Sequence, residues 1–61
     1  MGNGFYVIKE WDGSKVIAFV KLVAKNMYRV TDTTTLHSSE HNLNVLQSIV
    51  VRSAKQSEIN I

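Results

Sequence analysis

The sequence predicts an α+β fold, in which a three-stranded antiparallel meander packs against one helix. Two observations favour this class. Residues 5–31 contain apolar and β-branched segments separated by turn residues, whereas residues 43–53 space their apolar side chains as a helix does. An all-β small barrel is the alternative, because four β-branched residues between positions 45 and 51 lower the helix propensity of that segment.

The first predicted element is a hairpin of residues 5–11 and 15–24. Asp12 and Gly13 between them adopt positive φ readily, which suits a two-residue type I′ turn. In that register Glu10 faces Lys15. The core face is then expected to carry Phe5, Val7, Val16, Ala18, Val20 and Leu22. The outer face is expected to carry Tyr6, Ile8, Glu10, Lys15, Ile17, Phe19 and Lys21.

A third strand is predicted over residues 27–31, after a turn at Lys25 and Asn26. A strict two-residue loop puts Arg29 on the core face, whereas a three-residue loop with a bulge puts Tyr28 and Val30 there. Because burying an unpaired arginine is costly, we expect the bulged connection, with Arg29 pointing outward.

Residues 32–42 are polar and are predicted to form a connection that ends in a helix cap. Ser38, Ser39 and Asn42 are the candidate caps. The predicted helix over residues 43–53 covers the core face of the sheet with its apolar stripe. That stripe consists of Leu43, Leu46, Ile49, Val50 and Ala54. Residues 57–61 alternate, which favours a short fourth strand over a frayed end.

Length and composition limit the protein to one small domain, residues 1–61. Because the chain has no cysteine, neither a disulfide framework nor a thiolate zinc site can stabilise it. A packed core or a second copy must do so, and we expect a homodimer. The formal charge of +2 is spread along the chain, which is only a weak indication of nucleic-acid binding.

The sequence also predicts a cytoplasmic protein without a membrane partner. The longest apolar run, residues 16–20, is far shorter than the roughly 20 residues that cross a bilayer. The first residues carry no Lys or Arg and lead into a strand-like pattern, so we expect no secretory signal.

Nothing in the sequence spells out a catalytic site, so we expect a protein that is not an enzyme and needs no cofactor. His37 and His41 stand four residues apart with Glu40 nearby, a spacing that could hold a metal on a helix. The metalloprotease pattern is absent, however, and solvated loop histidines explain the pair more simply. We therefore predict no metal site.

The informative feature is the predicted outer face of the sheet. A sheet covered on one side usually shows polar residues on the other, so aromatic and aliphatic groups there indicate that this face is also used. The expected partner-binding residues are Tyr6, Trp11, Lys15, Ile17, Phe19, Lys21 and Arg29. The candidate occupants are the chain's own tail or a second copy, a different protein, and nucleic acid.

The first hypothesis is a small regulator or inhibitor that binds another protein and masks its surface. A nucleic-acid-binding module that uses the same basic and aromatic face is the alternative. A meander followed by a helix is similar in topology to the arm-binding domains of phage and transposon integrases and to the plant AP2-type domain, which implies duplex DNA binding. Short chains without cysteine also resemble accessory regulators encoded by phages and other mobile elements.

Overall fold

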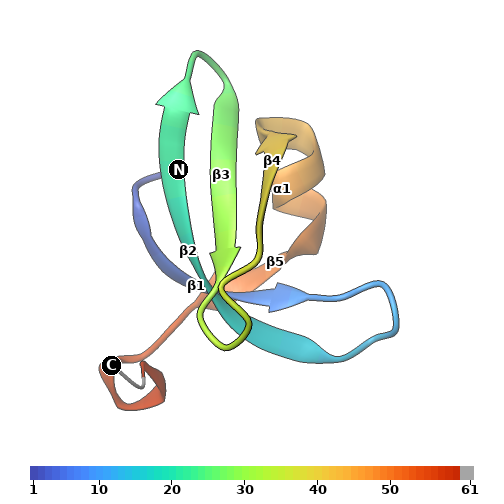
Figure 1. Ribbon diagram of the computed structural model, residues 1–61, viewed down its shortest axis with the longest axis vertical. Helices are drawn as coiled ribbons and strands as arrows, with labels where there is room; N and C mark the ends of the chain where they lie inside the picture. The colour runs from blue at the N-terminus through green and yellow to red at the C-terminus, as the bar shows by residue number, and fades with distance from the viewer. Residues whose placement is uncertain (60–61) are drawn as a thin grey trace.

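The computed structural model describes residues 1–59, which form five antiparallel strands and one helix (Figure 1). The strands are β1 (Gly4–Lys9), β2 (Lys15–Ala24), β3 (Met27–Asp32), β4 (Ser38–Asn42) and β5 (Val50–Ser53). Helix α1 (Leu43–Ile49) lies between β4 and β5, and a 3₁₀ turn, η1 (Gln56–Glu58), follows. The strand order is β4-β3-β2-β1-β5. The predicted α+β class is confirmed, although the sheet has more strands than expected.

Strand β2 belongs to both halves of the sheet, because it pairs with β1 along one part and with β3 along another. Its residues from 15 to 20 pair with β1, and those from 18 onward pair with β3. Figure 1 shows the bend that results, which curls the sheet around one inner face. The buried core on that face consists of Ile8, Ala18, Val20, Tyr28, Val30 and Leu46. Within residues 1–59, no helix is long and apolar enough to cross a membrane.

The predicted β1–β2 hairpin forms, but its loop has three residues instead of two. The Glu10 amide donates to the Ser14 carbonyl at 2.7 Å, and the Gly13 amide donates to the Glu10 carbonyl at 3.0 Å. Gly13 has φ of +90°, the conformation that closes a three-residue loop built on a type I turn. The predicted pairing of Glu10 with Lys15 is therefore wrong, because Lys15 faces Lys9.

This shift of one residue turns every side chain of β1 to the opposite side from the one predicted. Phe5 faces Phe19 and Val7 faces Ile17 on the outer face, while Tyr6 joins the inner core. We define the outer face by its four apolar members, Phe5, Val7, Ile17 and Phe19. Val16, Ala18 and Val20 of β2 contribute to the core side as predicted, but Leu22, which was also predicted there, is 47% exposed.

The faces of β3 follow the prediction, but the predicted three-residue loop is wrong, because Ala24 pairs with Met27 and the turn has two residues. Tyr28 and Val30 are buried in the core, whereas Arg29 points outward. The pairing shifts between Leu22 and Ala24, so the bulge lies within β2 at Val23. The two-residue turn at Lys25 and Asn26 is possible because Asn26 adopts φ of 59°.

Strand β4 was predicted as an irregular connection, and that prediction is wrong. Polar side-chain pairs with β3, rather than buried apolar side chains, stabilise this strand. Arg29 binds Glu40 with an N–O distance of 2.9 Å, and the hydroxyls of Thr31 and Ser38 lie 2.9 Å apart. Asn42 is the helix cap, as predicted, and its Oδ1 accepts from the Val45 amide at 2.9 Å.

The predicted helix over residues 43–53 ends at Ile49, and Val50 begins β5 instead. The β-branched run from Ile49 to Val51 explains the change, because such residues favour an extended pleated backbone. Leu46 is fully buried in the core, with Leu43 and Ile49 packed against it. Since β5 pairs with β1 after the helix, the topology differs from a meander followed by a helix, and the likeness to integrase arm domains does not hold.

The C-terminal segment forms a 3₁₀ turn rather than the predicted short strand. Arg52 binds Glu58 through both terminal guanidinium nitrogens, Nη1 and Nη2, at 2.6 and 2.7 Å, which ties this turn to β5. The Lys55 amide also donates to Glu58 at 2.8 Å. The rest of the predicted strand, residues 60–61, lies outside the described residues.

Candidate partner-binding cleft

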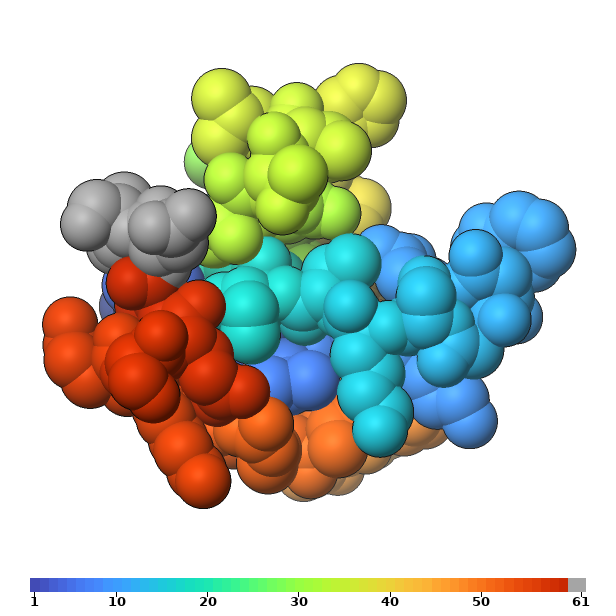
Figure 2. Space-filling model, turned by 90° about the horizontal axis from the view of Figure 1, so that it is seen from below, coloured from blue at the N-terminus to red at the C-terminus, as the bar shows by residue number. Residues whose placement is uncertain are grey.

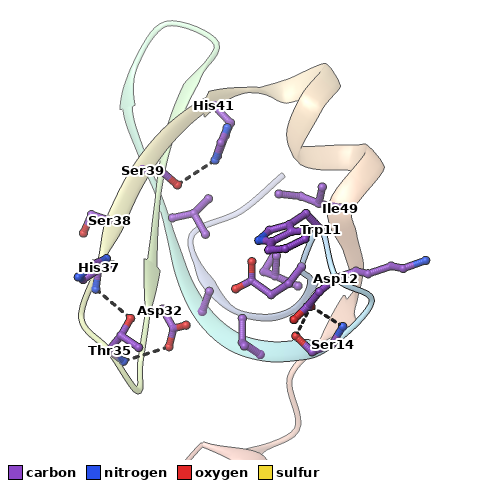
Figure 3. Close-up of a pocket in the computed structure, with 16 residues that line it drawn as sticks. Trp11, Asp12, Ser14, Asp32, Thr35, His37, Ser38, Ser39, His41 and Ile49 are labelled. Atoms are coloured by element: carbon purple, nitrogen blue, oxygen red, sulfur yellow. Dashed lines mark hydrogen bonds between the residues drawn. The ribbon is translucent and has the colours of Figure 1, made fainter.

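A cleft of about 730 Å³ opens on the inner side of the sheet, between the β1–β2 loop and β4 (Figure 3). Its floor is apolar and comes from several elements. Ile8 lies on β1, Ala18 on β2, Val30 on β3 and Ile49 on α1. The cleft is therefore the open end of the same face that holds the core.

The two walls of the cleft come from loops that are far apart in the sequence. Figure 3 shows Trp11, Asp12 and Ser14 on one side. On the other side it shows Asp32 at the end of β3, Thr35 of the β3–β4 turn and side chains of β4. In Figure 2 the β1–β2 loop (blue) and the β3–β4 turn (yellow-green) form separate projections.

Trp11 stands at the tip of the β1–β2 loop and is 97% exposed. A tryptophan so open to water is unusual, because its indole ring is among the largest apolar groups a protein can bury. The loop that presents it is well ordered by hydrogen bonds. Asp12 Oδ1 accepts from the amide and the hydroxyl of Ser14 at 2.9 and 2.7 Å. Trp11 is thus an apolar group held in position at the rim of the cleft.

Charge is divided between the cleft and the rest of the surface. The residues that line the cleft include the acidic residues Glu10, Asp12 and Asp32 and one basic residue, Lys9, whose side chain points to the outer side of the sheet. Counted with neutral histidines, this is a formal charge of −2 in a chain of +2. Glu40 and Glu58, the acidic residues outside the cleft, both bind arginines. Within residues 1–59 the three cleft carboxylates form no salt bridge.

Two of the three carboxylates are fixed by the turns that carry them. The hydrogen bonds from Ser14 lower the pKa of Asp12, so this group stays ionised well below neutral pH. Asp32 Oδ1 accepts from the amides of Thr34 and Thr35 at 2.7 and 3.3 Å. The Asp32 amide in turn donates to the His37 carbonyl at 2.9 Å. The negative charges therefore have defined positions on both walls.

The wall formed by β4 presents Ser39 and His41 to the cleft. The Ser39 hydroxyl and His41 Nε2 lie 2.9 Å apart, and Glu40, between them in the chain, pairs with Arg29 instead. In the part of the chain that the structure describes, no three His, Cys, Asp or Glu side chains are placed to hold a metal ion. Both histidines thus line the cleft, and they do not assemble with Glu40 into a metal site.

The structure distributes the predicted partner-binding residues over three places. Trp11 is on the cleft rim, and Tyr6 is part of the inner core, so its predicted place on the outer face is wrong. The others lie on the outer side of the sheet, where Lys15 faces Lys9, and Lys21 faces Arg29. Ile17 and Phe19 are there as expected, but they are partly buried.

The outer face is itself a small apolar cluster. Val7 is only 5% exposed, and Phe5 packs edge to face against Phe19 with ring centroids 5.1 Å apart. The Ala54 amide donates to the Phe5 carbonyl at 2.9 Å, so the chain after β5 runs beside β1. These contacts show that the apolar side chains of the outer face pack largely against one another.

Sequence reasoning missed the carboxylates of the cleft. Asp12 and Asp32 were read only as turn residues, and Glu10 was assigned to the outer face beside Lys15. Strand β4 was not predicted from the sequence. This strand places the turn after Asp32 opposite the β1–β2 loop. No protein-family model, no curated protein and no solved structure matches this chain.

Proposed function

We propose that this protein is a small binding module, not an enzyme, that regulates or inhibits another protein by holding a segment of it in the cleft. The observation that supports this most is Trp11, which is 97% exposed and stands on an ordered loop above an apolar floor. Tryptophan is the residue type that most often dominates the energy of protein interfaces. Its exposure costs the free protein solvation free energy that a bound partner recovers.

The experiment is a selection from a random-peptide display library on the immobilised chain. Ligands should emerge that bind the wild type and lose at least about tenfold in affinity for Trp11→Ala, as expected for a hot-spot residue. Val45→Ala is the matched control, because Val45 is an exposed apolar residue on α1 that does not line the cleft. Ligands that bind Trp11→Ala as well as the wild type would contradict the proposal.

Self-association through Trp11 is a second occupant that the experiment must separate. Light scattering over a dilution series of the free chain measures it directly. A constant monomer mass supports a cleft that is open for a different protein. A dimer that Trp11→Ala dissociates would show that the cleft binds a second copy, and the proposal would fail.

A nucleic-acid-binding function has one observation in its favour, which is the pairing of like charges on the outer side of the sheet. Lys9 faces Lys15 and Lys21 faces Arg29, and directly opposed like charges weaken a sheet. Retention on duplex DNA or single-stranded RNA that falls steeply with added salt supports this second candidate. Absence of retention at low salt excludes it.

A further inference from the structure

We infer that the cleft takes an extended, positively charged peptide segment, which pairs with β4 as an added strand. This inference rests on the proposed function and names the class of partner. Its first support is the state of the sheet edges. In the described sheet, β4 pairs with β3 on one side only, and the cleft lies along its residues Ser38, Ser39 and His41.

The two edges of the sheet are protected to different degrees. Strand β5 has four residues, and a register shift interrupts its pairing with β1. Strand β4 pairs with β3 over five consecutive residues without a shift, and it contains neither proline nor lysine. Bulges, prolines and charged side chains, lysine above all, are the usual devices that prevent another strand from adding to an edge. Strand β4 has no bulge, proline or lysine, and its one acidic residue, Glu40, is paired with Arg29, so its edge is open to strand addition.

The charge of the cleft selects the sign of the partner. Glu10 and Asp12 on one wall and Asp32 on the other form no salt bridge within the described chain, whereas both acidic residues elsewhere do. An incoming lysine or arginine therefore finds carboxylates that are free to pair with it. Phosphate groups and acidic peptides meet repulsion at the same place.

Trp11 adds a second reason for a cationic partner. The face of an indole ring attracts ammonium and guanidinium groups more strongly than any other aromatic side chain does. Because the ring is exposed at the rim, a lysine or arginine of the bound segment can stack on it while its neighbours pair with β4. Side chains alternate along a strand, so only every second residue of the segment faces the cleft.

The test uses synthetic peptides and isothermal calorimetry on the full chain. The main probe is a capped peptide that alternates lysine and threonine, and it is compared with its glutamate–threonine analogue. A third peptide has the same composition as the first but groups its lysines together. The alternating lysine peptide should bind at least about tenfold more tightly than the glutamate analogue, and more tightly than the grouped one. Equal affinities, or a preference for glutamate, would overturn the inference.

Backbone methylation of the alternating peptide tests the added strand itself. Amides on alternate residues of an edge strand point toward its neighbour, so N-methylation of one alternate set should abolish binding. Methylation of the other set should leave binding nearly unchanged. If both methylated sets bind alike, the segment does not pair with β4.

Variants of the chain identify the carboxylates that act. Glu10→Gln and Asp32→Asn keep an oxygen acceptor and remove the charge, and each should weaken binding about two- to fivefold at low salt. Glu58→Gln is the control, because Glu58 pairs with Arg52 away from the cleft. An equal loss in the control would show a general charge effect. If display yields ligands that need Trp11 but are acidic, the inference falls and the proposed function stands, whereas a failure of every ligand to need Trp11 removes both.

Discussion

Phe5 and Phe19 face each other across β1 and β2, with ring centroids 5.1 Å apart and an interplanar angle of 60°. This edge-to-face pair exists only because the hairpin loop has three residues. In the register of a two-residue loop, Phe5 would turn toward the core and leave Phe19 without this partner. The formation of this pair on the outer face therefore depends on the conformation of the loop at the other end of the strands.

The pair should contribute measurably to stability. We expect Phe19→Ala to lower the free energy of unfolding by about 1–3 kcal/mol, less than for a fully buried phenylalanine. A double-mutant cycle with Phe5→Ala should give a coupling of about 0.5–1.5 kcal/mol, measured by urea denaturation. Additive effects of the two substitutions would contradict the packing described.

Gly13 should be sensitive to substitution because of its backbone conformation. No heavy atom lies within 4 Å of a Cβ added there, so its φ of +90° is the only obstacle to a side chain. We expect Gly13→Ala to destabilise the fold by about 1 kcal/mol. Gly2→Ala is the control, because Gly2 is unobstructed and has no such φ. Equal thermal midpoints for the two variants would show that the loop does not need glycine.

Leu46 anchors the helix to the sheet. It is 0% exposed in the core cluster, so Leu46→Ala should cost about 2–5 kcal/mol and leave much of so small a domain unfolded. The neighbouring Val45 is 44% exposed, and Val45→Ala should change stability by no more than about 0.5 kcal/mol. Circular dichroism during denaturation compares the two. A mild effect at Leu46 would mean that α1 does not contribute to the core.

The salt bridge between Arg52 and Glu58 should make the stability of the fold depend on pH in the acidic range. The hydrogen bonds from Arg52 and from the Lys55 amide lower the pKa of Glu58 from 4.5 to about 2. A depressed carboxyl pKa stabilises the fold above the unfolded value and loses that effect as the pH falls toward the folded one. The stability difference between wild type and Glu58→Gln should therefore be constant near neutral pH and disappear between pH 4.5 and about 2. A stability difference that persists at still lower pH would show that the salt bridge does not cause it.

The parts of the fold that local patterns encode could be predicted. The hairpin, the third strand and the outward position of Arg29 follow from alternation and from the cost of burying a charge. The cap at Asn42 follows from its side-chain chemistry. The loop length could not be predicted, because Asp12 and Gly13 fit both a two-residue and a three-residue loop, and only the full set of core contacts decides between them.

Strand β4 and the end of the helix required tertiary information. The residues of β4 are polar, so no apolar alternation marks them, and pairing with Arg29 and Thr31 makes them a strand. The helix ends at Ile49 because Val50 pairs with β1. The cleft depends on both features, so the sequence made Trp11 a candidate binding residue but gave no reason to consider Asp32.

The central claim is that Trp11 is open in the free protein and covered in the complex. The chain has a single tryptophan, so its fluorescence reports on this position alone. The free chain should emit as a water-exposed indole that acrylamide quenches efficiently, and a selected peptide should shift the emission to shorter wavelength and protect it. Blue-shifted, protected emission in the free monomer, or no change when a peptide binds, would contradict the account.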